Sequence, residues 1–188
     1  TLPAGNTSLT GAYNRWKLRA LFAFAGFYLF VYMGRFALWP AAPIIREDLS
    51  FTHVEIGIIN AVLLWGFGAG DLVHGRMAEA YGLRLWVTLG AISTTALAIT
   101  TSFATNIWTF AIPWGLAGFV NAAVWAPGIS LLSQWWPRTE RGRALGVVGV
   151  AAGGAMLTMW LVTGWVASEW GWGAAFRSPP LLMAGAAV

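Results

Sequence analysis

The chain has 188 residues, of which 58% are apolar and only 10% are charged, and its formal net charge is +4. Soluble domains carry roughly 25% charged residues, so this composition excludes a soluble enzyme and predicts a membrane protein with several spans. The chain has no cysteine, which excludes disulfides and thiol chemistry, and His53 and His74 fall in no metal-ligand spacing. We therefore expect neither a metal nor another cofactor.

Residues 1–14 are predicted to form a polar cytoplasmic tail, and residues 15–188 a transmembrane bundle. Crossing a bilayer core of about 30 Å takes roughly 20 helical residues. Period-two alternation is absent, which favours an all-α fold over a barrel. Five apolar segments are long enough to span, and a sixth is too short and is expected to be an incomplete helix: 20–40, 56–77, 85–104, 107–132, 144–167 and 174–188.

Basic residues are distributed unequally between the two sides of the predicted spans. Arg46 and Arg177 lie on one side, and eight basic residues lie on the other: Arg15, Lys17, Arg19, Arg76, Arg84, Arg138, Arg141 and Arg143. Lys and Arg are enriched in cytoplasmic loops, so the N-terminus is predicted to be cytoplasmic. We expect an integral protein of the bacterial inner membrane. The same bias explains the basic composition without a nucleic-acid partner.

Small residues recur at helical spacing in two of the predicted spans. The second span contains Gly66 and Gly70, one turn apart, and this spacing allows helices to approach closely. The stretch 66–70 is similar to a nucleotide-binding loop, but such a loop follows a strand and opens a helix in water, so we interpret it as packing. We expect the same of the glycines near and within the fifth span: Gly142, Gly146, Gly149, Gly153 and Gly154.

Two charged residues inside the spans are the strongest functional signal. A charge in hydrocarbon costs at least about 2.5 to 3.5 kcal/mol on insertion scales. Arg35 lies roughly 22 Å along the first span, and its fork of donors suits a carboxylate or phosphate of a substrate; a purely structural role is the alternative. Asp71 is a candidate proton carrier, and pairing with Arg76 is an equal alternative. Axial counting places Arg35 and Asp71 at different depths.

A polar residue followed four positions later by a Trp occurs in both the first and the fourth spans. Arg35 precedes Trp39, and Asn121 precedes Trp125. In two inverted three-helix repeats these helices correspond and meet across a central cavity, although chance similarity is an equal alternative. The candidate substrate-binding residues are Arg35, Tyr32, Asn60, Asn121 and Trp125, with Tyr28 and Trp65 as further candidates for the cavity wall.

Two loop motifs resemble those of the major facilitator superfamily. Glu79 and Ala80 stand where the first signature usually has Asp and Arg. The resemblance implies gating roles for Gly75, Glu79, Gly82, Arg84, Glu140 and Arg141. The stretches that carry it are Gly75-Arg76-Met77-Ala78-Glu79-Ala80-Tyr81-Gly82-Leu83-Arg84 and Gln134-Trp135-Trp136-Pro137-Arg138-Thr139-Glu140-Arg141-Gly142-Arg143-Ala144.

Two branches of that superfamily are the nearest in sequence. The segment around Arg35, 32–38, resembles the first helix of the anion:cation symporters, whose arginine contacts an acidic substrate, and 121–127 is similar to the fourth helix of the organophosphate:phosphate antiporters. Asp71 stands where the antiporters have a lysine, which argues against a phosphate. The symporters' arginine and glutamate of the fourth helix would fall near Gly115 and Ala122, so the chain lacks both.

The resemblance implies the N-terminal six-helix half of a major facilitator, built from two inverted three-helix repeats. The implied function is secondary transport of a small organic anion by alternating access, with Asp71 as the proton site and a C-terminal six-helix half as partner. The alternative is a truncated transporter fold that serves as an accessory subunit of a larger membrane complex. In neither case is the chain expected to be an enzyme.

Overall fold

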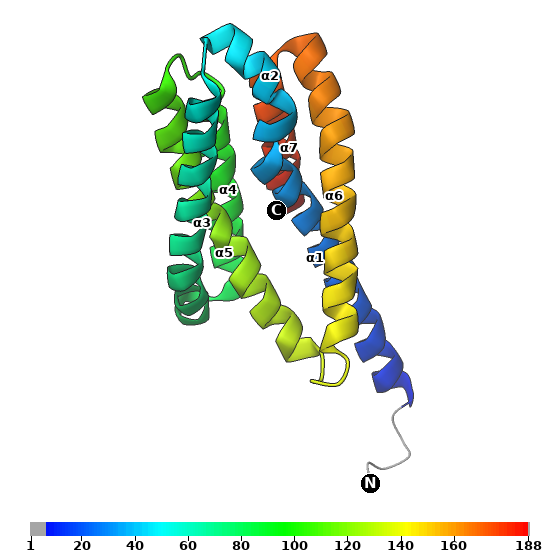
Figure 1. The fold of residues 1–188 in the computed structure, drawn as a ribbon. Helices are drawn as coiled ribbons and strands as arrows, with labels where there is room; N and C mark the ends of the chain where they lie inside the picture. The colour runs from blue at the N-terminus through cyan, green and yellow to red at the C-terminus, as the bar shows by residue number, and fades with distance from the viewer. Residues whose placement is uncertain (1–6, 188) are drawn as a thin grey trace.

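The computed structural model describes residues 7–187, and it contains helices and short connections with no strand among these residues (Figure 1). The helices are α1 (Thr7–Phe36), α2 (Leu38–Leu49), α3 (His53–Tyr81), α4 (Leu83–Thr101), α5 (Ile107–Trp135), α6 (Arg141–Trp170) and α7 (Trp172–Ala187). Four segments are long and apolar enough to cross a membrane: Tyr13–Leu49, which joins α1 and α2, together with α3, α5 and α6. The apolar part of α4 is shorter, Leu85–Thr101.

The first predicted span is two helices with a break at Ala37. Pro40 has no N–H to donate to the carbonyl of Phe36, and its ring crowds that turn, so α1 ends there and α2 begins. The chain remains helical well beyond the predicted end of this span, as far as Leu49. Ser50 then adopts a left-handed conformation with φ 55°, which ends α2.

From α3 onward, the helix ends lie within four residues of the predicted spans. At the start of α3, a capping box extends the helix into polar sequence. Before α3, the Thr52 side chain accepts a hydrogen bond from the backbone N–H of Glu55, and the Glu55 side chain accepts one from the N–H of Thr52. Likewise, α1 begins at Thr7, inside the segment predicted to be a tail, and residues 1–6 lie outside the described part.

The packing of the helices has an internal two-fold relation. Helix α3 packs on α5, and α6 packs on α1; α4 contacts α5, and α7 contacts α1; α4 and α7 contact each other. Exchanging α1 with α5, α3 with α6 and α4 with α7 leaves this set of contacts unchanged. Two inverted three-helix repeats produce this pattern, so the predicted fold class is confirmed.

Three segments lie at the end of the bundle where α1 begins (Figure 1). They are the start of α1, the connection from α3 to α4 at Gly82, and the connection from α5 to α6 at residues 136–140. We call this end the basic end, because the eight residues that predicted the orientation belong to these segments and the helix ends beside them: Arg15, Lys17, Arg19, Arg76, Arg84, Arg138, Arg141 and Arg143.

Glycines bring α3 and α5 into close contact. A Cβ atom added at Gly66 or Gly70 would collide with the carbonyl oxygen of Gly115 or Phe119 on α5, so packing at these two glycines is confirmed. The same expectation for α6 is wrong in the described part of the chain. A Cβ atom at five glycines near or within α6 would meet nothing within 4 Å: Gly142, Gly146, Gly149, Gly153 and Gly154.

The apolar core consists of clusters arranged along the bundle. One joins α2, α5 and α7 around Phe110 and Trp114, and another, nearer the basic end, joins α1, α4, α5 and α6 around Tyr28 and Val124. Along α1 and into α2, the cluster around Tyr28 ends at Val31, and the cluster around Phe110 begins at Ala37. A smaller cluster of Met33, Ala155 and Met159 fills the interval, with Phe36 packed against it, and Arg35 lies at this level of α1.

Candidate functional site

A pocket of about 580 Å³ opens between α1, α3, α5 and α6. We call it the central pocket. Three predicted site residues line it: Tyr32, Asp71 and Trp125. Tyr28 joins them, and its ring centroid lies 5.0 Å from that of Tyr32 and 5.0 Å from that of Trp125. The pocket thus combines an aromatic wall with one carboxylate, and α6 contributes Leu145, Val148, Gly149 and Ala152.

Arg35 lies one helical turn beyond Tyr32 on α1 and does not itself line the central pocket. Its guanidinium carbon is 3.5 Å from the centroid of the Phe67 ring on α3, a cation–π contact that favours the charge in a desolvated site. Among the described residues, the only ion pair joins Lys17 to Glu140, so no carboxylate neutralises Arg35 by direct contact. Asp71 interacts with Arg35 through space but forms no ion pair with it.

Asp71 is half-buried, and its Oδ1 atom has no hydrogen-bond partner within the described residues. His74 lies one turn further along α3. Its Nδ1 atom accepts a hydrogen bond of 3.1 Å from the Trp86 indole N–H, and its ring centroid is 4.8 Å from that of Phe119. His74 is therefore held by its aromatic neighbours, whereas Asp71 presents a carboxylate oxygen to the central pocket.

The structure places Arg35 and Asn121 on one small cavity, and neither of them lines the central pocket. This cavity lies between α1, α3, α4 and α5. Two other candidates lie elsewhere. Trp65 is 80% exposed, and Asn60 precedes Asp71 by about 16 Å along α3 and lines neither this cavity nor the central pocket.

Comparison with known proteins identifies the fold. The sequence matches the profile of the Major Facilitator Superfamily over residues 24–188. The chain belongs to this superfamily.

The chain is also similar to several curated proteins. A probable hexose phosphate transport protein of Chlamydia pneumoniae is 29% identical over 92% of this chain and 38% of its own length. The membrane sensor protein UhpC of Salmonella typhimurium is 30% identical over 85% of this chain and 36% of its own length. A phosphoglycerate transporter protein of the same species is 24% identical over 70% of this chain and 28% of its own length. The chain thus spans between about a quarter and two fifths of these relatives.

The major facilitator loop signature between the second and third spans is almost entirely helical here. Gly75 and Glu79 lie on the last turns of α3, and Arg84 lies in the first turn of α4. Gly82, with φ 94°, is the single residue between the two helices. The positive φ requires a glycine. The predicted loop is therefore a sharp reversal at Gly82 that lies between two rigid helix ends.

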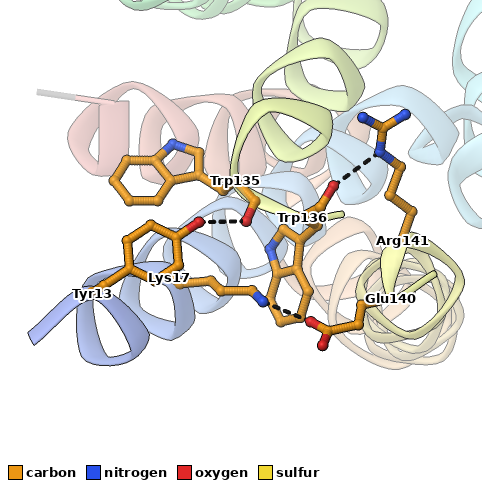
Figure 2. A network of polar contacts seen from close by, with 6 residues as sticks. All are labelled: Tyr13, Lys17, Trp135, Trp136, Glu140 and Arg141. Carbon is orange, nitrogen blue, oxygen red and sulfur yellow. Dashed lines mark hydrogen bonds and ion pairs between the residues drawn. The ribbon is translucent and has the colours of Figure 1, made fainter. Parts of the chain in front are cut away.

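The second predicted gating motif forms a network that ties α1 to the connection between α5 and α6 (Figure 2). The Lys17 ammonium is 2.7 Å from a carboxylate oxygen of Glu140 and 3.8 Å from the centroid of the Trp136 ring. Lys17 is buried, so the carboxylate and the ring together replace much of its hydration. The Lys17 ammonium, by hydrogen bond and by charge, holds the pKa of Glu140 below its ordinary value.

Two further residues, Tyr13 and Arg141, complete this network (Figure 2). The Tyr13 hydroxyl donates a hydrogen bond of 2.9 Å to the carbonyl of Trp135, and the two rings stack with centroids 5.8 Å apart. Arg141 donates from Nε to the Trp136 carbonyl at 3.0 Å and from a terminal nitrogen to the Ser133 carbonyl at 2.7 Å. These bonds satisfy carbonyls at the end of α5. We call this network the basic-end clamp: Tyr13, Lys17, Trp135, Trp136, Glu140 and Arg141.

Proposed function

We propose that this chain forms one half of a secondary transporter that binds a small organic anion in the central pocket and moves it by alternating access. One observation carries the proposal: Arg35 is half-buried in an apolar part of the bundle, lies against Phe67, and has no carboxylate in direct contact among the described residues. A guanidinium in such a place persists when it serves a ligand. Its planar fork of donors suits a carboxylate or phosphate.

Arg35 and the residues that line the pocket have distinct roles in this proposal. Arg35 binds the anionic group, and the rings of Tyr28, Tyr32 and Trp125 pack against the carbon skeleton. Asp71 carries the coupling proton. The names of the relatives support a small organic anion as the substrate, because they include hexose phosphate, phosphoglycerate, sulfoacetate and L-galactonate transporters. Two of these names contain a phosphorylated substrate. They weaken the argument that Asp71, which stands where the antiporters have a lysine, excludes a phosphate.

A second six-helix unit is the proposed partner. The chain spans only 38% of the hexose phosphate relative, and a Cβ atom added at five of the α6 glycines, from Gly142 to Gly154, would meet nothing within 4 Å in the described part. Both α3 and α6 line the central pocket, so a unit packed along them would close it. Rocking of the two units about the pocket would expose it to each side in turn. The proposed orientation places the basic end in the cytoplasm, where Gly75, Glu79, Gly82, Arg84, Glu140 and Arg141 would gate the entrance.

Removal of the Arg35 charge tests the anion site. A hydrogen bond to a charged group contributes about 1.5 to 3 kcal/mol, so Arg35→Gln should weaken binding of a hexose phosphate by about 10- to 150-fold. Arg46→Gln is the matched control, because Arg46 lies on α2 and donates to the Phe51 carbonyl. Binding is measured by calorimetry on the full-length protein in detergent. Equal affinity of Arg35→Gln and wild type would contradict the anion site.

Proton coupling is tested separately in proteoliposomes. Asp71→Asn should abolish accumulation driven by a pH gradient while exchange of substrate across the membrane continues. Undiminished accumulation would remove Asp71 from the coupling mechanism, and it would leave the role of Arg35 intact.

A second candidate function is sensing of the same class of ligand. The observation that favours it is the 30% identity to a protein named a membrane sensor. A sensor would bind hexose phosphate in an Arg35-dependent manner and show no uptake in proteoliposomes. An accessory subunit of a membrane complex would show neither property.

A further inference from the structure

The small cavity beside Arg35 is lined by residues of four helices. Its walls are almost entirely apolar, and the polar residues of its lining belong to α1, α4 and α5. The lining residues are Gly34, Arg35, Leu63, Thr94, Ala98, Trp114, Ala117 and Asn121. Trp114, Asn121 and Thr94 are 2%, 4% and 7% exposed, and the indole nitrogen of Trp114 and the hydroxyl of Thr94 are inaccessible to solvent.

Three buried polar atoms on this cavity have no hydrogen-bond partner within the described residues: Nε of Arg35, Nε1 of Trp114 and Oγ1 of Thr94. The first two can only donate. The Thr94 hydroxyl and the Asn121 side-chain oxygen can accept. A buried donor or acceptor without a partner destabilises a structure about as much as a lost hydrogen bond, and three such groups on residues around one void indicate a shared partner.

The size of the cavity restricts what this partner is. The space open to the centre of a water molecule is about 10 Å³, which is room for about one water molecule. A phosphate, a carboxylate or a sugar does not fit. The ligand must also accept from two donors and donate to two acceptors, which a water molecule does with its two lone pairs and two protons.

We propose that one ordered water molecule occupies this cavity and positions Arg35. The water accepts hydrogen bonds from Arg35 Nε and Trp114 Nε1, and it donates to Thr94 Oγ1 and to the Asn121 amide oxygen. The Phe67 ring covers the guanidinium carbon of Arg35, and the water accepts a hydrogen bond from the Nε atom of Arg35. The two terminal nitrogens remain for the anion of the central pocket. Thr94 and Trp114 are therefore positioning residues, and this consequence rests on the proposed function.

The bound water is tested without any substrate. The protein is labelled with ¹⁵N-tryptophan in micelles, and the Trp114 indole resonance is assigned from its loss in Trp114→Phe, or in Trp114→Tyr where the phenylalanine variant does not fold. The Trp114 indole proton should show a magnetisation-transfer peak to water with the sign expected for a long-lived bound molecule. The peak should weaken strongly in Thr94→Val. Absence of the peak in the wild type would overturn the proposal.

The neighbouring threonine provides a matched control. Thr95 lies on the same helix and is also 7% exposed, but its hydroxyl donates to the Ala91 carbonyl of its own helix at 2.9 Å. Thr95→Val removes an equally buried hydroxyl and should leave the Trp114 peak intact. Equal loss of the peak in both valine variants would show a general effect on packing, and that result would also overturn the proposal.

The positioning role is tested by hexose phosphate binding to the full-length protein. Thr94→Val should raise the dissociation constant by about two- to tenfold, the range expected for one net hydrogen bond, and Thr95→Val should not. In the Arg35→Gln background, Thr94→Val should have no further effect, because the water then has no guanidinium to hold. Additive losses would overturn the positioning role. Failure of the wild type to bind hexose phosphate would contradict the proposed function. The resonance experiment would still decide whether the water molecule is bound in the cavity.

Discussion

The contact between α3 and α5 allows a quantitative prediction from two glycines on one helix. A Cβ atom at Gly66 would collide with the backbone of Gly115 and lie 3.1 Å from the backbone nitrogen of Phe119. Because the obstacle is backbone, the helices must separate. A Cβ atom at Gly68, two residues along, meets nothing within 4 Å. Gly66→Ala and Gly68→Ala therefore differ in packing at closely matched helical positions.

The magnitude follows from the difference between the two variants. Each alanine gains about 1 kcal/mol of helix propensity, and this term cancels in the comparison. Overpacking costs typically 1 to 3 kcal/mol, so Gly66→Ala should be less stable than Gly68→Ala by about this amount, or about 5- to 150-fold in the unfolding constant. Both variants are unfolded from micelles by increasing denaturing detergent and followed by circular dichroism. Equal stability of the two would show that the close approach of α3 and α5 is wrong.

Two further predictions concern the basic-end clamp and the end of α2. The ion pair with Lys17 lowers the pKa of Glu140, so the pair stabilises the fold at neutral pH. This stabilisation disappears as the pH falls through the lowered pKa of Glu140. Between about pH 5 and pH 3, the melting temperature should therefore fall less in Glu140→Gln and in Lys17→Met than in the wild type. Identical pH profiles would refute the pair. Ser50→Gly should stabilise the protein by about 0.5 to 1 kcal/mol, because glycine adopts the left-handed conformation without steric cost, and an unchanged melting temperature would contradict this.

The spans were predictable because hydropathy alone separates lipid-crossing helices from their connections. Their ends were not, since capping extends helices into polar sequence. The hydroxyl of Thr52 and the carboxylate of Glu55 start α3 before its apolar part, and a single glycine, Gly82, suffices to turn the chain between α3 and α4.

The candidate site was predictable where helical spacing decides the face. Tyr28 and Tyr32 are one turn apart on α1, and Trp125 lies one turn after Asn121 on α5, so each pair shares a face. Trp65 could not be placed in this way. Helix α3 is apolar around most of its circumference, and periodicity then gives no indication of which side faces the pocket.

The basic-end clamp was not predictable from the sequence. Lys17 and Glu140 are 123 residues apart, and Lys17 was already explained by the orientation bias of basic residues. The sequence motif that contains Glu140 and Arg141 indicated a functional segment, but only the fold shows that α1 is its partner.

The five residues 136–140 that join α5 to α6 are attached to α1 on both flanks, through Tyr13 on the Trp135 side and through Lys17 on the Glu140 side. Helices α5 and α6 otherwise share little direct contact, and both line the central pocket. The length of this short connector therefore sets how far apart these two walls stand near the basic end. A single insertion or deletion there would alter the width of the pocket entrance and leave every residue of its lining unchanged.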